Sequence, residues 1–329
     1  MKWRWIAGSC LAVAVVVYAA FQASPWPAVW LIRFGFEQGT RSQKHGLQKY
    51  LPDDVAALHD ERYGGGSDER LDAFFPKTIE KTTRTLPTIV WVHGGAFVYG
   101  DKSNVEEYLK ILAAKGYTTV GVDYSIAPGA KYPTPVKQVN QALAFLLRNA
   151  DRFHVDTSNI FLAGDSAGSQ IAAQVAALTA DAGYAEKVGI RPALSPAQLR
   201  GAILFCGIYD AAHLKFDGRF GWMLRAVVWS YFGKKHWAGD PRLEEFDILQ
   251  HVTPQFPPAF VSVGNADPLQ GQSNLLAAEL RNKGVAVDTL FFPTDYHPSL
   301  PHEYQFTLDN EAGQRALQRV TEFLARRIT

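Results

Sequence analysis

One short motif constrains the fold of this chain more than any other feature. The residues Gly-Asp-Ser-Ala-Gly at 164–168 directly follow the apolar run 160–163, and a run of small residues over 169–178, typical of a helix, follows them. A sharp turn from strand to helix exposes the residue at its tip above the sheet edge, and flanking glycines let strand and helix approach without Cβ clashes. The motif therefore predicts a strand, a tight turn and a helix, with Ser166 as a candidate nucleophile.

Strand and helix patterns alternate along most of the chain. Strand patterns occupy residues 88–92, 118–124, 160–163, 201–207, 259–264 and 285–292, and helix patterns occupy 105–114, 136–147 and the last residues from 311 on. Alternation of this kind predicts a mostly parallel central sheet flanked by helices, an α/β fold. Ser103 and Glu106 have the spacing of a capping box at the start of the helix 105–114. With 329 residues, 47% of them hydrophobic, the chain is long enough for one large core.

A glycine-containing loop lies upstream of the serine. His93-Gly94-Gly95-Ala96-Phe97 follows the strand pattern 88–92. Acyl transfer develops negative charge on a carbonyl oxygen, and backbone N–H groups already aimed at that oxygen stabilise it. We expect Gly94 and Gly95 to bring such donors close, with the N–H of Ala167 as a third. His93 lies on this donor loop, and we interpret it as a residue that braces the loop.

An activated serine needs a base, and the base needs an orienting carboxylate. Asp267 follows the strand pattern 259–264, at the sheet edge where α/β proteins keep their chemistry. After the next strand pattern, one loop holds two histidines, His297 and His302. Counting from Asp267 slightly favours His297, whereas Pro298 biases His297 toward an extended conformation suited to the outer part of the loop.

These motifs together resemble the hormone-sensitive-lipase-like branch of the α/β-hydrolases, also called family IV bacterial esterases. The resemblance extends over most of residues 85–329. It depends on four motifs: residues 93–97, residues 122–124 with Ala127-Pro128, residues 164–168, and Asp267-Pro268-Leu269 followed by His302. It implies an α/β-hydrolase fold with a helical cap or lid.

The resemblance also implies roles for individual residues. Ser166 is then the nucleophile, Asp267 the acid and His302 the base, because the family's spacing from the base to the final helix fits His302 and not His297. The oxyanion donors are Gly94, Gly95 and Ala167. The chain departs from the family at Ala96, where a third glycine is usual, and at residues 128–133, which lack the usual ion-pairing residues. We expect Ala96 to be tolerated if its φ stays below zero.

Charge and cysteine content narrow the choice of partners. The formal net charge of +1 gives no reason to expect a nucleic-acid partner. Cys10 lies in the N-terminal apolar run and Cys206 in the strand pattern 201–207, so we expect neither a disulfide nor a metal cluster. We predict no cofactor. The sequence does not indicate the oligomeric state.

The N-terminus resembles a targeting or anchoring segment. Lys2 and Arg4 precede an apolar run over 6–21. At about 1.5 Å per helical residue, this run is somewhat short for a hydrocarbon core of about 30 Å, although Trp3, Trp5, Trp26 and Trp30 are placed like interfacial aromatic residues. Small residues for signal-peptide cleavage are scarce. We therefore favour an uncleaved membrane anchor, with the catalytic domain outside the cytoplasm, over a cleaved signal with a secreted or periplasmic protein; a buried helix of the enzyme is the remaining alternative.

The domain prediction follows from these segments. Residues 1–23 form the anchor or signal, residues 24–84 a cap arm and linker interrupted by glycines at 64–66, and residues 85–329 the catalytic domain. Residues 208–258 form a lid insertion rich in aromatic residues, which suggests an acyl or aromatic ester as substrate.

The expected function is hydrolysis of small to medium acyl or aromatic carboxylic esters through an acyl-enzyme. One alternative keeps the triad but changes the bond to an amide, formamide or thioester. Another is a non-catalytic small-molecule-binding member of the fold, against which the available histidines argue.

Overall fold

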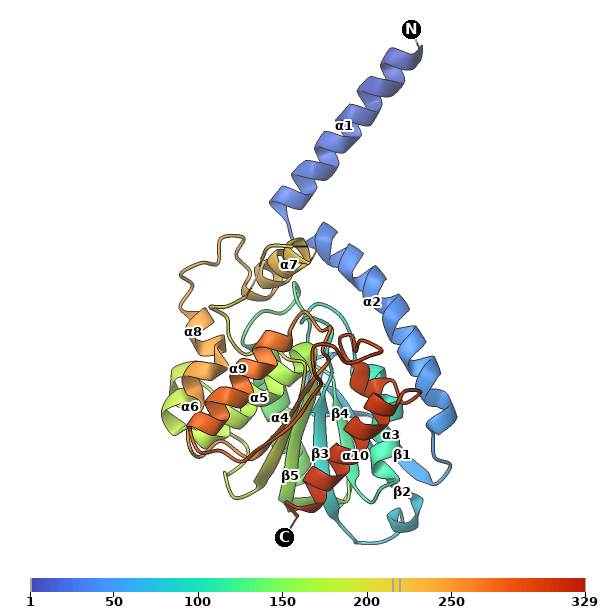
Figure 1. The fold of residues 1–329 in the computed structure, drawn as a ribbon, viewed down its shortest axis with the longest axis vertical. Helices are drawn as coiled ribbons and strands as arrows, with labels where there is room; N and C mark the ends of the chain where they lie inside the picture. Colours follow the sequence, from blue (N-terminus) through green and yellow to red (C-terminus); the bar gives the residue numbers. More distant parts are fainter. Residues whose placement is uncertain (1, 215, 219, 329) are drawn as a thin grey trace.

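The fold is built around one eight-stranded sheet (Figure 1). The computed structural model describes residues 2–214, 216–218 and 220–328, together with the side chains of these residues except 2–5, 7 and 8. The order of the strands across the sheet is β1-β2-β4-β3-β5-β6-β7-β8. The strands are β1 Val55–Arg62, β2 Arg70–Pro76, β3 Leu86–Val92, β4 Thr118–Val122, β5 Val155–Asp165, β6 Leu199–Phe205, β7 Ala259–Val263 and β8 Val287–Phe291.

The strands from β4 to β8 in this order run parallel, as the alternation of patterns predicted. Successive residues of a strand point to opposite faces, and β3 shows the result. Val90 and Val92 join one buried apolar cluster, while Ile89 and Trp91 join the other. Both faces of the sheet are therefore buried, which explains why its central strands read as continuous apolar runs.

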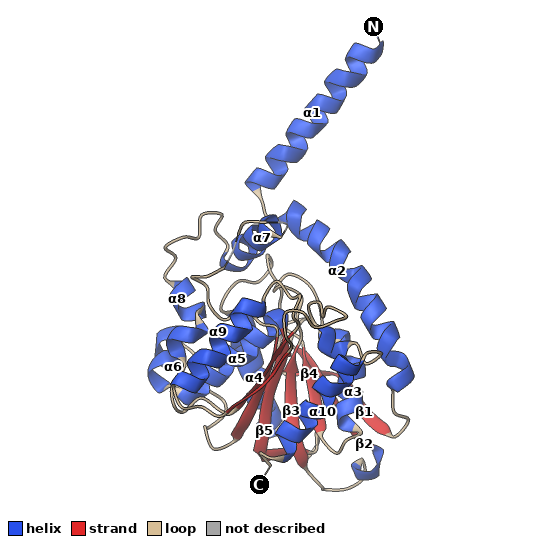
Figure 2. Ribbon diagram, in the orientation of Figure 1, coloured by secondary structure: helices blue, strands red, loops and turns tan. Residues whose placement is uncertain are grey.

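Helices cover the two faces (Figure 2). One cluster holds residues of α4, α5 and α9, and the other holds residues of α3 and α10. The helices are α1 Lys2–Ala23, α2 Trp26–Leu47, α3 Glu106–Ala113, α4 Thr134–Arg148, α5 Ser166–Ala180, α6 Ala182–Val188, α7 Gly221–Phe232, α8 Arg242–Phe246, α9 Gln270–Asn282 and α10 Glu311–Ala325. The predicted capping box of α3 is wrong: Val105 is its N-cap without a side-chain hydrogen bond, and Ser103 lies in a preceding turn capped by Asp101.

The segment 24–84 is more than a cap arm and linker. Its glycines at 64–66 lie in the connection of a hairpin, β1 with β2, and β2 pairs antiparallel with β4. The hairpin therefore extends the sheet, and the predicted boundary at residue 84 separates two strands from the sheet to which they belong. An antiparallel extension of a parallel sheet needs no crossover helix. The alternation of strand and helix patterns along the chain therefore does not reveal this hairpin.

The helix α2 crosses the carboxyl edge of the sheet and contacts α7 of the segment 208–258 (Figure 1). Its Ala28, Val29 and Ile32 are buried, and Arg33 donates from Nε to the carbonyl oxygen of Val98 at 2.7 Å and from Nη2 to that of Ala127 at 3.1 Å. Apolar contacts and hydrogen bonds thus fix α2 to the two loops that follow β3 and β4.

The helix α1 projects away from the rest of the chain (Figure 1). Within the described residues, no single helix is both long and apolar enough to cross a membrane. Ser9–Ala23 and Trp26–Tyr50 meet that requirement only as a pair bent by 91°. The predicted transmembrane helix is therefore not supported, and the side chains of Trp3 and Trp5 lie outside the described residues.

Candidate active site

Ser166 lies at the turn between β5 and α5, as predicted. Its φ of 51° is in the left-handed region, which a non-glycine residue occupies only when its surroundings enforce it. A Cβ on Gly168 would lie 2.0 Å from the carbonyl oxygen of Val92, and one on Gly164 would lie 2.5 Å from the backbone of Gly168. Strand and helix thus approach so closely that both positions require glycine.

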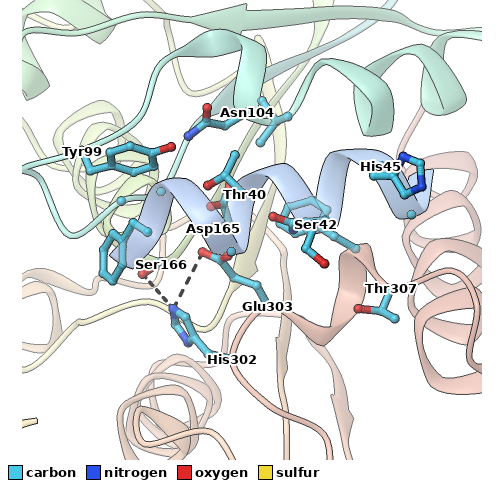
Figure 3. A pocket seen from close by; sticks show the side chains of 18 of the residues that line it. Thr40, Ser42, His45, Tyr99, Asn104, Asp165, Ser166, His302, Glu303 and Thr307 are labelled. Atoms are coloured by element: carbon cyan, nitrogen blue, oxygen red, sulfur yellow. Dashed lines mark hydrogen bonds and ion pairs between the residues drawn. The ribbon is translucent and has the colours of Figure 1, made fainter. Parts of the chain in front are cut away.

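Three side chains from separate loops meet above this turn (Figure 3 shows two of them). The Nε2 of His302 lies 2.9 Å from the Oγ of Ser166, and its Nδ1 lies 2.8 Å from the Oδ2 of Asp267. The Asp267 side chain is fully buried, and its Oδ1 accepts the N–H of Leu269 at 2.8 Å. Since each residue follows the carboxyl end of a parallel strand, the sheet itself brings the three together.

His297, the other histidine of this loop, is exposed. Burial lowers the pKa of His302, but the hydrogen bond to Asp267 and the charge of that carboxylate oppose burial, and the pKa lies well above its ordinary value. Within the described chain, His302 is the histidine that the structure places against Ser166.

The glycine-containing loop lies beside the serine, and Gly94 and Gly95 line the same cavity as Ser166. A Cβ on Gly95, at φ 105°, would lie 2.0 Å from the carbonyl oxygen of Tyr99, so the loop requires glycine here. A Cβ on Gly94 would lie 2.3 Å from the Oδ2 of Asp165, so this position also requires glycine. Ala96 has a φ of 53°, so the condition under which we expected alanine to be tolerated here is not met.

His93 braces this loop, in agreement with its interpretation from sequence. Its ring stacks on Tyr124 at 4.3 Å, its Nδ1 lies 2.8 Å from the carbonyl oxygen of Gly94, and burial lowers its pKa to about 4. The Tyr124 hydroxyl donates to the carbonyl oxygen of His93 at 2.9 Å. A neutral, enclosed ring of this kind holds the loop in place from behind.

Sequence reasoning missed Cys206 as a neighbour of the site. Its thiol, the Asp267 carboxylate and a His302 ring nitrogen all lie within 4.8 Å of one another, and burial raises the pKa of Cys206 to about 11. This trio could be mistaken for a metal centre, but both ring nitrogens of His302 already contact Asp267 and Ser166. The available signal was position: Cys206 directly follows β6 at the carboxyl edge.

A cavity of about 700 Å³ opens beside Ser166 and His302. One wall belongs to α2, with Phe36, Thr40 and His45, and the facing wall includes the segment from His302 to Asp309. Polar side chains are frequent in both walls (Figure 3). Among the described residues of the segment 208–258, none lines this cavity.

Known proteins share both the sequence pattern and the fold. The family described as the α/β-hydrolase fold matches residues 89–300. The acetyl esterase of Salmonella choleraesuis (strain SC-B67) is 25% identical over 235 residues, which cover 69% of each chain.

Solved structures agree with that assignment of the fold. An inhibited esterase B from Lactobacillus rhamnosis has a TM-score of 0.78 at 22% identity and covers 91% of this chain and 97% of its own. The hyperthermophilic esterase from Pyrobaculum calidifontis has a TM-score of 0.71 at 21% identity and covers 95% of this chain and 96% of its own. The family match over residues 89–300, the esterase relatives and the eight-stranded sheet agree, and the chain belongs to the hormone-sensitive-lipase-like esterases of the α/β-hydrolase superfamily.

Proposed function

We propose that this esterase is a serine carboxylic-ester hydrolase that acts through an acyl-enzyme on esters of short acyl groups. The observation that carries the proposal is the continuous contact from Ser166 through His302 to the buried Asp267, at 2.9 and 2.8 Å. A hydroxyl is a weak nucleophile by itself, and this arrangement supplies both the base and the carboxylate that orients it.

Each residue then has one role. His302 Nε2 takes the proton of the Ser166 hydroxyl as its Oγ attacks the ester carbonyl, and the tetrahedral intermediate expels the alcohol, which His302 protonates. Water repeats the cycle: His302 takes its proton, the hydroxide attacks the acyl-enzyme, and the acid leaves with Ser166 restored. Asp267 keeps the imidazole in the tautomer whose Nδ1 carries a proton and stabilises the imidazolium.

The oxyanion is held by backbone N–H groups. Ala167 lies in the first turn of α5, where free N–H groups and the helix dipole favour negative charge. We assign the other donors to the loop after β3, at Gly94 and Gly95, which line the cavity beside Ser166. Gly94 must also be small, since a Cβ there would lie 2.3 Å from the Oδ2 of Asp165.

The cavity supports a short acyl group. Its walls mix polar side chains such as Thr40 and Asn104 with a few apolar ones such as Phe36 and Phe306, so a long alkyl chain would find little continuous apolar surface. The acetyl esterase of Salmonella choleraesuis is named for a short acyl group. We therefore expect kcat/KM to be highest for p-nitrophenyl acetate to butyrate and to fall for longer chains.

The nucleophile is tested by Ser166→Ala. Turnover of p-nitrophenyl butyrate should fall about 10⁴-fold or more, because a triad acts as a unit and only the oxyanion and binding contributions remain. Labelling by a fluorophosphonate should disappear with it, while the circular dichroism spectrum stays unchanged. A variant that retained a tenth of the activity would refute the assignment.

The base is tested by a matched pair of histidine variants. His302→Ala should abolish turnover as fully as Ser166→Ala, whereas His297→Ala should change kcat/KM by no more than about twofold, because His297 is exposed. The reverse result would transfer the role of base to His297.

We also propose that α1 attaches the enzyme to a membrane. Between Ile6 and Tyr18, the large apolar residues of α1 that face solvent are each 50–68% exposed. The helix also projects from the body of the chain (Figure 1). Exposed apolar surface of that extent is unfavourable in water and favourable in lipid. Trp30 and Phe34, on the outer face of the adjoining α2, are 69% and 71% exposed and extend the same apolar surface.

A further inference from the structure

Two carboxyl groups converge beside the nucleophile (Figure 3). A Cβ on Gly94 would lie 2.3 Å from the Oδ2 of Asp165 and 3.0 Å from the Oε1 of Glu303, so both groups border the same small space. Two ionised carboxylates this close repel each other, and burial together with the charge of Glu303 raises the pKa of Asp165, so the pair favours a state that holds one proton.

The position of Glu303 is fixed by its backbone. It directly follows His302 and has a φ of 59°, a conformation that is uncommon for a non-glycine residue. Its Oε1 lies 3.8 Å from the Nε2 of His302, the same nitrogen that contacts Ser166. Asp267 contacts the opposite nitrogen of the ring, so carboxyl groups face the imidazole from both sides.

Asp165 is the member of the pair that holds the proton. Burial and the neighbouring Glu303 raise the pKa of Asp165 well above its ordinary value, although the indole N–H of Trp91, at 2.7 Å, and the N–H of Gly94 oppose them. Glu303 is partly exposed, with 26% of its side chain accessible, so water stabilises its charge better than that of Asp165.

The other titratable groups that face the pair are the Tyr124 hydroxyl beside Asp165 and the Cys206 thiol near Glu303. Burial raises the pKa of both, so both are neutral near pH 7. Glu303 therefore carries the negative charge of this group, 3.8 Å from the ring that must become an imidazolium.

We propose that Glu303 is a positioning residue of the catalytic histidine: its carboxylate, aimed by the protonated Asp165, stabilises the His302 imidazolium from the Nε2 side and sets the acid limit of activity. The proposal rests on the proposed function, because it acts through the base of the triad. No bond is made or broken at Glu303. The single proton of the carboxyl pair stays on Asp165 throughout the cycle.

The test is the pH profile of Glu303→Gln. An anion near the ring raises the pKa of His302, and kcat/KM requires the neutral ring, so removing the charge should extend activity to lower pH. We expect the acid limb of kcat/KM for p-nitrophenyl butyrate to move down by about half a pH unit or more. The plateau kcat should fall about threefold to tenfold, since the imidazolium loses a partner, while KM should change less than about twofold.

Three further variants separate charge from structure. Glu303→Asp keeps the charge and should restore an acid limb close to that of the unaltered enzyme. Asp165→Asn replaces a protonated acid by an amide that can accept from Trp91 and donate to Glu303, so its acid limb should also stay in place. Asp309→Asn removes a carboxylate from the far part of the cavity, where it pairs with Lys49, and should not move the limb.

An unchanged acid limb in Glu303→Gln would overturn the proposal. So would a downward shift in Asp165→Asn equal to that expected for Glu303→Gln, because the charge would then belong to Asp165. Failure of the proposed function is recognised separately, by activity that survives Ser166→Ala or His302→Ala.

Discussion

At the scale of single residues, backbone strain gathers around the nucleophile. Among the described non-glycine residues with positive φ, Ser166, Cys206 and Glu303 adjoin the cavity or the triad, and Ala96 and Phe97 follow the cavity-lining Gly95. The other two, Asp60 and His154, do not line the cavity. Such conformations cost free energy and persist only where surrounding contacts enforce them. For Ser166 and Glu303, the strained backbone aims a functional side chain. At Ala96, the strained backbone aims no functional side chain.

Ala96→Gly should therefore stabilise the fold. A left-handed alanine costs about 1–2 kcal/mol, of which glycine returns part through its greater freedom in the unfolded chain, so we expect a gain of about 0.5–1 kcal/mol in the free energy of unfolding. Urea unfolding followed by circular dichroism measures it.

The matched control is Ala114→Gly. Ala114 is exposed at the end of α3 with a φ of −60°, where alanine is unstrained, so this variant should destabilise by about 0.5–1 kcal/mol. Two variants that destabilise equally would show that the φ of Ala96 carries no strain.

Residues at strand ends could be predicted well from sequence, and residues that meet through space could not. Ser166 and Asp267 each follow an apolar run that can only be a buried strand, and their place at the sheet edge follows from that. The contact of Asp165 with Glu303 joins positions far apart in the chain, and no local pattern encodes it. Cys206 lies between these cases, because its strand was predicted but its turn toward His302 was not.

At the scale of elements, α2 is the part of the site that sequence reasoning located only in part. The sequence placed it in a cap arm and linker over residues 24–84, whereas in the structure its residues from Gly35 to Gly46 contribute one wall of the cavity. The hairpin β1–β2 was missed for a related reason. A strand added to a sheet antiparallel has no crossover helix to reveal it.

The attachment of α2 can be tested through Arg33→Met. The change removes the hydrogen bonds to the carbonyl oxygens of Val98 and Ala127 while it keeps an apolar stem of similar length. Two partly buried acceptors lose a charged donor, which costs about 1.5–3 kcal/mol per bond, so the helix should loosen from the oxyanion loop. We expect kcat/KM to fall about tenfold and cleavage by trypsin within α2 to become faster.

Arg41→Met serves as its control. Arg41 lies on the same helix, but its side chain is 71% exposed and pairs only with Glu37 among the contacts described for it. Exposed pairs of this kind contribute about 0–1 kcal/mol, so kcat/KM should stay unchanged. Equal losses in both variants would indicate a general effect of charge rather than the fastening of α2.

At the scale of the whole molecule, the chain divides into an enzyme body and an exposed apolar helix. Pro25 and Pro27 separate α1 from most of α2, and a proline at the start of a helix favours a new direction of the chain. The bend of 91° between Ser9–Ala23 and Trp26–Tyr50 lies at this point. No described residue of α1 lines the cavity, and the end of α1 reaches the body through Phe21, which packs against the core, and Gln22, which accepts from the Nζ of Lys235.

Deletion of residues 1–23 should consequently separate membrane attachment from activity. The full chain should sediment with membranes and resist extraction by carbonate, because its apolar helix prefers lipid to water. The shortened chain should remain in the supernatant, with kcat/KM for p-nitrophenyl butyrate within about twofold of the full chain. A variant with Val13→Lys and Val16→Lys should behave like the deletion, since both positions are more than half exposed and a charge there opposes entry into lipid. Recovery of the native protein as a soluble chain that begins at Ala20 would show instead that the segment is a cleaved signal, and a full chain that stays soluble and intact would refute attachment altogether.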